Sequence, residues 1–158
     1  MNQSKELEAY LTGRWLTDFS NFAAFVFHGL PDLNWAGFYL DHDDKLYLAN
    51  FVGKPACTEI SYARGVCGAA FTRRESLLVP DVNEFPGHIA CDSASRSEMV
   101  IPLLVRGQCL GVFDLDSPLV NRFTDHDRAI AEQWLKLLLE RVFPEGAPLY
   151  PWKATPVI

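Results

Sequence analysis

Four cysteines are the residues of this chain with the greatest capacity for chemistry: Cys57, Cys67, Cys91 and Cys109. A thiolate is a strong nucleophile, and its sulfur can be oxidised and reduced reversibly. Consecutive cysteines lie 10, 24 and 18 positions apart, so none of them forms a CxxC pair or a zinc-finger spacing. We therefore expect neither a structural metal site nor a local dithiol motif of the thioredoxin type.

Cys91 is the strongest candidate for a reactive thiol. It lies in the segment 81–97, which has no apolar periodicity and contains a proline and a glycine. Long loops inside compact chains commonly carry function. Cys57 also lies in a predicted loop, and Cys67 opens a short predicted helix whose N-terminus would lower the thiol pKa. Cys109 begins an apolar strand and is predicted to be a small buried hydrophobic residue.

Three carboxylates form the second candidate group. Asp114 and Asp116 stand two positions apart on an apolar strand, so they share one face at a separation of roughly 7 Å. The turn 106–108 could bring Glu98, at the start of the neighbouring strand, close to both. Such a cluster could bind an ammonium group, or mutual repulsion could keep one acid protonated and ready to donate. The alternative is that the strand ends here and the acids are solvated.

Aromatic residues and one histidine complete the candidates. Trp35 and Tyr39 lie on one face of a predicted strand, either as core residues or as an aromatic wall for an apolar ligand group. His88 precedes Cys91 by three positions and could pair with its thiolate, although it could equally be a solvated loop residue.

The elements that must position these residues alternate between helices and strands. Helical spacing of apolar residues covers the first 30 positions, with Gly13 dividing the stretch and Ser20 capping its second half. A further short helix is expected over 66–73, and a final helix begins after Thr124, with Asp127 completing a capping box, and ends at Pro144. Strands are predicted over 35–40, 45–51, 77–79, 99–105 and 110–115. This order predicts an α+β fold with a mostly antiparallel sheet, helices from both chain ends on one face, and a loop-covered pocket on the other.

Size and charge limit the possible functions. The 158 residues suit one domain over 1–144, followed by an extended tail over 145–158 that contains three prolines. A net charge of −6 without any basic run argues against nucleic acid as a partner. No apolar stretch reaches the length of a membrane span, and the first residues lack a signal peptide's apolar core. We therefore expect a cytoplasmic protein without membrane contact, whose thiols are kept reduced.

Several short motifs resemble the free methionine-(R)-sulfoxide reductases, which are GAF-domain enzymes. They are GKPAC at 53–57, GVCG at 65–68, PDV at 80–82, FPGHIACD at 85–92, SRSE at 95–98 and GVFDLDSP at 111–118. Their order and spacing match the family from about residue 35 to 118. The resemblance implies a GAF-like fold in which Cys91 is the nucleophile and Cys57 and Cys67 are resolving or auxiliary thiols. It also implies that Glu98, Asp114 and Asp116 contact the substrate, that Trp35 and Tyr39 shape the pocket, and that backbone amides near Ile89 and Ala90 hold the sulfoxide oxygen.

The reaction implied by the resemblance is the reduction of free L-methionine (R)-sulfoxide without a bound cofactor. Cys91 becomes a sulfenic acid, Cys57 or Cys67 converts it to a disulfide, and thioredoxin, supplied by NADPH and thioredoxin reductase, restores the thiols. Glu98 or Asp114 is the proton donor, and a homodimer is expected. Two other classes of function remain open: a GAF sensor that binds a small molecule without turnover, and a redox switch that forms a Cys57–Cys91 bond without a substrate.

Overall fold

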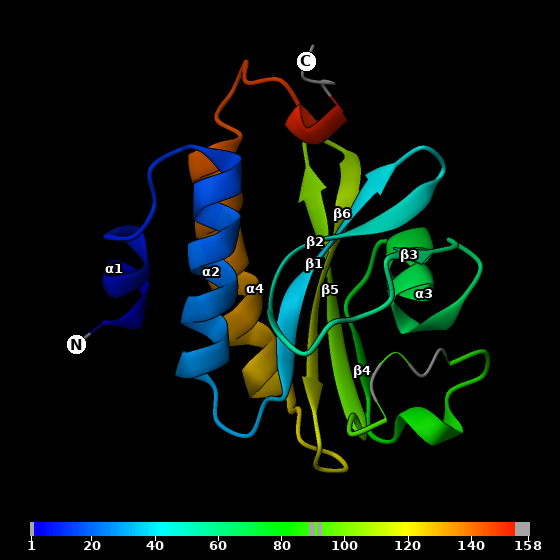
Figure 1. Ribbon diagram of the computed structural model, residues 1–158. Helices are drawn as coiled ribbons and strands as arrows, with labels where there is room; N and C mark the ends of the chain where they lie inside the picture. Colours follow the sequence, from blue (N-terminus) through cyan, green and yellow to red (C-terminus); the bar gives the residue numbers. More distant parts are fainter. Residues whose placement is uncertain (1, 89–90, 92, 154–158) are drawn as a thin grey trace.

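A single antiparallel sheet is the centre of the protein. The computed structural model describes residues 2–88, 91 and 93–153, and within these ranges the sheet has six strands in the order β3-β2-β1-β6-β5-β4 (Figure 1). Every neighbouring pair is antiparallel. The strands are β1 Trp35–His42, β2 Lys45–Gly53, β3 Glu59–Ile60, β4 Leu77–Val79, β5 Ser97–Val105 and β6 Gln108–Ser117. The predicted strands are confirmed within a few residues, while the two-residue β3 was not predicted.

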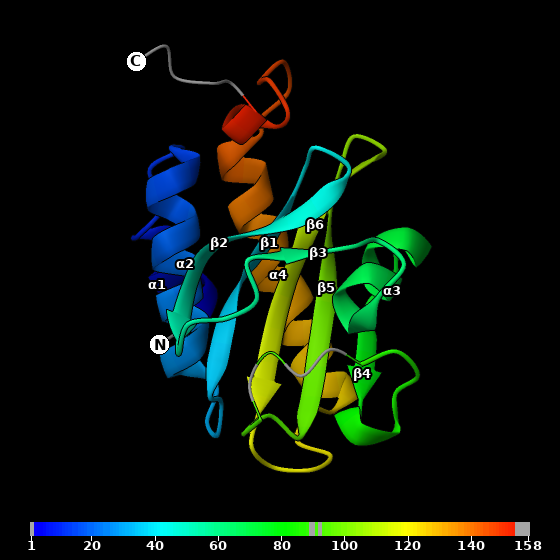
Figure 2. The ribbon, with the colours of Figure 1, turned by 45° about the vertical axis from the view of Figure 1, so that its right-hand side comes forward.

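Helices cover the two faces of the sheet unequally. The helices are α1 Gln3–Glu8, α2 Trp15–Gly29, α3 Gly65–Arg73 and α4 Asp125–Val142, with short 3-10 turns η1 at Val82–Glu84 and η2 at Pro151–Lys153. In both views α1, α2 and α4 lie on one side of the sheet, and α3 lies on the other (Figures 1 and 2). The predicted α+β architecture, with the terminal helices on one face, is confirmed.

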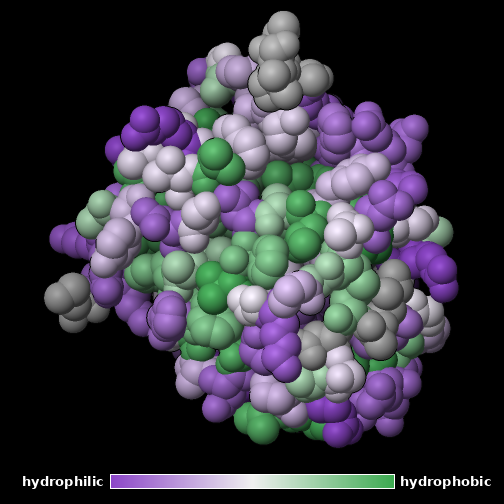
Figure 3. Space-filling view, viewed as in Figure 1, coloured by the Kyte–Doolittle hydropathy of each residue, from purple (hydrophilic) through white to green (hydrophobic). Residues whose placement is uncertain are grey.

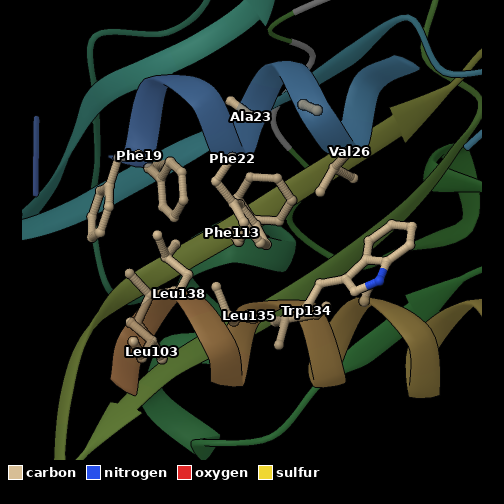
Figure 4. Close-up of a cluster of buried hydrophobic side chains, with 14 of the residues drawn as sticks. Phe19, Phe22, Ala23, Val26, Leu103, Phe113, Trp134, Leu135 and Leu138 are labelled. Carbon is tan, nitrogen blue, oxygen red and sulfur yellow. The ribbon is translucent and has the colours of Figure 1, made fainter. Parts of the chain in front are cut away.

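The alternation of side chains along the strands divides the apolar residues between these two faces. On the side of α2 and α4, Phe113 packs against Phe22 and Phe38, with ring centroids 5.0 and 4.7 Å apart. Figure 4 shows apolar side chains of α2 and α4 meeting those of the sheet in this layer. Val112 belongs instead to the second cluster, together with Tyr39. The second face of the sheet therefore carries apolar side chains, such as those of Tyr39 and Val112. Polar residues next to Phe113 in the chain point to this face as well.

We expect Phe113→Ala to destabilise the protein by about 3–5 kcal/mol, because it removes an aromatic ring from a packed core. Phe113 is only 1% exposed. The measurement is urea unfolding followed by circular dichroism. Leu104→Ala is the matched control, because Leu104 is 47% exposed and should change the unfolding free energy by less than about 1 kcal/mol. Equal losses in the two variants would contradict this account of the core.

The two predicted helix caps, at Thr124 and at Ser20, have different outcomes. The capping box of α4 is confirmed, since Thr124 and Asp127 exchange hydrogen bonds. Ser20 does not cap a helix: α2 begins at Trp15, and the Ser20 hydroxyl donates to the Leu16 carbonyl inside it. Because α2 begins before Ser20, the backbone groups around Ser20 bond to one another within the helix and need no side-chain cap.

The described part of the tail, residues 145–153, is not a loose extended arm. The ring of Trp152 lies 5.6 Å from that of Trp15, and its indole N–H donates to the Asp41 carbonyl over 2.9 Å. Lys153 also lies 3.8 Å from the Asp41 carboxylate. Together, these contacts of Trp152 and Lys153 place the end of the described tail against α2 and β1.

The outer surface near β2 is partly apolar. Residues 47–52 of this strand are half-buried, and β3 pairs with only two residues of β2. On the face seen in Figure 1, apolar side chains gather across the middle and polar ones surround them (Figure 3). Among the described residues, no helix combines the length and apolar character that crossing a membrane requires.

Candidate active site

The register of three strands brings the predicted acids together. Glu98 of β5 lies opposite Asp116 of β6, and Asp114 lies two residues along the same strand. On the other side of β6, Trp35 of β1 pairs with Asp116. Because alternate residues point to one face, these side chains share the face opposite α2 and α4. Hairpin geometry predicted this convergence, and it is observed.

These side chains line a pocket on that face, with an empty volume of about 520 Å³ including the solvent at its opening. The lining combines acids, aromatic rings, sulfur atoms and small apolar groups. Its residues are Trp35, Tyr39, Ala56, Ile60, Gly65, Val66, Cys67, His88, Cys91, Ser95, Glu98, Asp114 and Asp116. The predicted positions Ile89 and Ala90 lie outside the described residues. Sequence reasoning singled out none of the five remaining lining residues. Ile60 lies outside the quoted motifs, and its apolar side chain carries no chemical signal. The other four lie inside quoted motifs without having been assigned a role: Ala56, Gly65, Val66 and Ser95.

Cys57 and Cys91 form a disulfide across two loops. Cys57 lies between β2 and β3, Cys91 lies between β4 and β5, and their Cα atoms are 5.3 Å apart although 34 positions separate them. Cys91 lines the pocket, so one sulfur of the pair lies next to the acids and aromatic rings. Two cysteines in this arrangement can pass two electrons to a ligand in the pocket. The ligand is reduced while the two thiols are oxidised to the disulfide.

Cys67 has a different environment from the one expected. It lies in α3 and is 4% exposed, and one donor atom from each of Cys67, Glu98 and Asp114 lies within 4.8 Å of the other two. Burial, followed by the charge of Asp114, raises the pKa of this thiol well above its usual value. The expectation that the helix N-terminus would lower this pKa is wrong, because desolvation disfavours the thiolate more strongly than the helix favours it.

The buried acids favour bound protons. Burial, then the charges of Asp116 and Glu98, raises the pKa of Asp114 well above its ordinary value. Burial also raises the pKa of Glu98, against an opposing hydrogen bond with Asp114. Glu98 and Asp114, two of the three residues whose donor atoms lie close together, therefore favour their protonated forms in this pocket. Asp114 is 5% exposed, and its Oδ1 has no hydrogen-bond partner within the described part of the chain, so it can accept a donor from a ligand.

Trp35 and Tyr39 serve both as core residues and as pocket walls. Their rings stack at 5.9 Å, and each is 2% exposed. Gly37 between them makes this possible, because a Cβ there would lie 2.7 Å from the Trp35 ring. The indole of Trp35 donates to the Lys54 carbonyl over 3.1 Å, and the hydroxyl of Tyr39 donates to the Cys57 carbonyl over 2.9 Å. The two interpretations offered by the sequence are therefore compatible.

The remaining candidates are His88 and Cys109. His88 is half-buried in the pocket lining, and its charge acts on Glu98 to lower the carboxyl pKa. Cys109 is a free thiol, 5% exposed, whose Sγ lies 3.5 Å from the Gly111 carbonyl oxygen. The prediction that Cys109 is a buried packing residue is confirmed.

Comparison with known proteins places this geometry among enzymes. The family model of the GAF domain matches residues 16–138. The free methionine-R-sulfoxide reductase of Escherichia coli is 45% identical over 141 residues, which cover 88% of this chain and 83% of that protein. The free methionine-R-sulfoxide reductase of Saccharomyces cerevisiae is 39% identical, covering 78% of this chain and 73% of that one. The crystal structure of the Neisseria meningitidis free methionine-R-sulfoxide reductase, in complex with its substrate, superposes with a TM-score of 0.82 at 37% identity and covers 89% and 83% of the two chains.

Proposed function

Because the chain belongs to the GAF-domain family of free methionine-R-sulfoxide reductases, we propose that it reduces free L-methionine (R)-sulfoxide to L-methionine with Cys91 as the nucleophile. The observation that supports this proposal most is the Cys57–Cys91 disulfide, because Cys91 also lines the pocket of the buried acids. The disulfide corresponds to the oxidised form of the enzyme at the end of a turnover.

The first step transfers oxygen from substrate to enzyme. The Cys91 thiolate attacks the sulfoxide sulfur while a protonated carboxyl, Asp114 or Glu98, donates a proton to the oxygen. The attack forms a sulfur–sulfur adduct whose oxygen is now a hydroxyl group. The substrate's sulfur–oxygen bond and the new sulfur–sulfur bond then break, the hydroxyl group passes to the Cys91 sulfur as a sulfenic acid, and methionine leaves with its sulfur reduced by two electrons. The raised pKa values of both acids support this role, since an ionised carboxylate has no proton to give.

The second step restores the thiols. The Cys57 thiol attacks the Cys91 sulfenic sulfur, a disulfide forms, and water leaves. A thioredoxin dithiol then reduces the disulfide by exchange, with electrons from NADPH through thioredoxin reductase. Cys57 is a better resolving residue than Cys67, whose thiol is buried and has a raised pKa. No bound cofactor takes part, and we place the reaction in the cytoplasm, in a homodimer, as the family implies.

The acids also account for selection of the free amino acid. Its ammonium group can donate hydrogen bonds to the carboxylate of Asp116 and to the Oδ1 of Asp114, which accepts a hydrogen bond even when that carboxyl group is protonated. A methionine sulfoxide inside a peptide has no such group. The apolar walls of Trp35 and Tyr39 then receive the methyl end of the side chain.

A coupled assay tests the function. The protein is mixed with thioredoxin, thioredoxin reductase and NADPH, and NADPH consumption is followed after addition of free methionine (R)-sulfoxide. We expect consumption with this substrate and little with the (S) form or with N-acetylated methionine sulfoxide. A GAF sensor or a redox switch would show none above background with any of them.

We expect Asp116→Asn to raise KM for free methionine (R)-sulfoxide about tenfold, because one charge that attracts the ammonium group is lost. Initial rates over a range of substrate concentrations give KM and kcat separately. Asp43→Asn is the matched control, since Asp43 lies in the β1–β2 turn with 75% of its side chain exposed. An unchanged KM in the Asp116 variant would mean that this acid does not bind the substrate.

A further inference from the structure

The loop that carries Cys57 is held by the walls of the pocket. This loop, residues 54–58, connects β2 to β3. It starts after Gly53, which has a φ of 136°, a backbone conformation that glycine adopts readily and that is strained for other residues. Hydrogen bonds fix it at the carbonyls of Lys54, Cys57 and Thr58, from Trp35, Tyr39 and the Leu48 amide respectively. The bond at Cys57 comes from the hydroxyl of a side chain, not from the backbone of a strand.

An apolar pocket wall does not need this hydroxyl. A phenylalanine at position 39 would offer the same ring face to a methyl group, and the hydroxyl of Tyr39 donates to the loop. Burial raises the pKa of Tyr39 far above its usual value, so the hydroxyl keeps its proton and remains a donor. The ring is itself fixed, because it is 2% exposed and stacks with Trp35. The donor therefore has a defined position in the fold.

We propose that Tyr39 is a positioning residue for the resolving step: its hydroxyl holds the Cys57 carbonyl so that the Cys57 thiol stays within reach of Cys91. This inference rests on the proposed function and adds a second role to a wall of the substrate pocket. Once methionine has left, the Cys91 sulfenic acid must meet the Cys57 thiol before it reacts with an external oxidant. A loop free to rotate about Gly53 would make that encounter rarer.

Trp35 holds the same loop at a less critical point. Its indole N–H donates to the Lys54 carbonyl, three residues before Cys57, whereas the Tyr39 hydroxyl binds the carbonyl of Cys57 itself. Loss of the Tyr39 hydroxyl should thus affect the position of the resolving thiol directly. We expect Tyr39→Phe to form the Cys57–Cys91 disulfide about fivefold more slowly than the wild type, the change expected for the loss of one neutral hydrogen bond.

A single-turnover experiment measures the two steps separately. Fully reduced protein is mixed with one equivalent of free methionine (R)-sulfoxide and quenched at intervals; methionine and disulfide are then quantified by mass spectrometry. In parallel, dimedone traps the sulfenic acid on Cys91. We expect Tyr39→Phe to slow disulfide formation more than methionine formation and to increase the dimedone adduct. Tyr62→Phe is the matched control, because its hydroxyl bonds to Asp41 and not to the Cys57 loop; it should change neither rate.

A second oxidant separates this inference from the proposed function. Hydrogen peroxide converts the Cys91 thiolate to the same sulfenic acid and releases water, so the resolving step can be followed without the sulfoxide. Slower disulfide formation in Tyr39→Phe after peroxide would support the positioning role even if the wild type made no methionine. A wild-type rate of disulfide formation after either oxidant would overturn it, as would an equal slowing of both steps with the sulfoxide, which would limit Tyr39 to substrate binding.

Discussion

Replacing Cys91 with serine is expected to abolish methionine formation, lowering kcat by about 10⁴-fold or more, as the loss of a catalytic nucleophile does. A serine hydroxyl is not ionised at neutral pH, and its oxygen, unlike sulfur, cannot take up the oxygen of a sulfoxide reversibly. The loss should appear in a single turnover of the reduced protein as well as in the thioredoxin-coupled assay, because the missing step comes first. Retention of most of the activity would remove Cys91 from the role of nucleophile.

Cys57→Ser should differ from Cys91→Ser in a way that misfolding cannot imitate. The Cys57 variant keeps the nucleophile, so it should release about one equivalent of methionine per protein and then stop when thioredoxin is the reductant. Cys109→Ser is the matched control, since Cys109 is a buried free thiol in β6 that lines no part of the pocket. Continued thioredoxin-dependent turnover by the Cys57 variant would show that another thiol resolves the sulfenic acid.

The sequence predicted the sheet and its acids well, because both follow from local periodicity. Strand alternation fixed Asp114 and Asp116 on one face, and a short turn between two apolar strands fixed Glu98 beside them. The Cys57–Cys91 pair could not be derived in this way: both residues lie in loops, and no periodicity links positions 34 residues apart. The family resemblance offered both Cys57 and Cys67 as partners of Cys91, and the packed domain brings the loop of Cys57 to Cys91.

Cys67 shows why local rules fail at buried positions. Its place in the first turn of α3 predicted a lowered pKa, which would hold for a helix end in water. The same turn packs against β5 and β6, next to Asp114 and Glu98. Burial and negative charge both depend on elements distant in the sequence, so neither could be read from GVCG alone. The tail gave a similar error, since Trp152 finds its partners in α2 and β1.

The buried acids place opposite demands on stability and on catalysis. Burial, and then the charges of Asp116 and Glu98, make an ionised carboxylate unfavourable at Asp114 and raise the pKa of this group, against an opposing hydrogen bond with Cys67. A carboxyl whose pKa is raised on folding stabilises the folded state fully at low pH. That contribution is lost as pH rises from the ordinary carboxyl range through the raised pKa. Retaining such a group is understandable if its proton is used in the reaction.

Asp114→Asn is therefore expected to make the protein more stable at neutral pH and far less active. Asparagine cannot ionise, so the melting temperature of the variant should exceed that of the wild type near pH 8. The difference between the two melting temperatures should shrink towards pH 5. Glu98→Gln is a parallel test for the other candidate donor, and the exposed Asp43→Asn variant, whose turn lies outside the pocket, should change neither property.

The activity of the Asp114 variant should fall about 10²–10⁴-fold in kcat/KM, the range typical of a lost general acid. In the wild type, kcat/KM should rise with pH as the Cys91 thiol ionises and then fall as pH passes through the raised pKa of the donating acid. The variant that removes the true donor should lose this second limb, whereas the other should keep it at a lower level. If both limbs persisted in Asp114→Asn and in Glu98→Gln alike, the proton would have to come from solvent or from His88, and the proposed role of the buried carboxyls would be wrong.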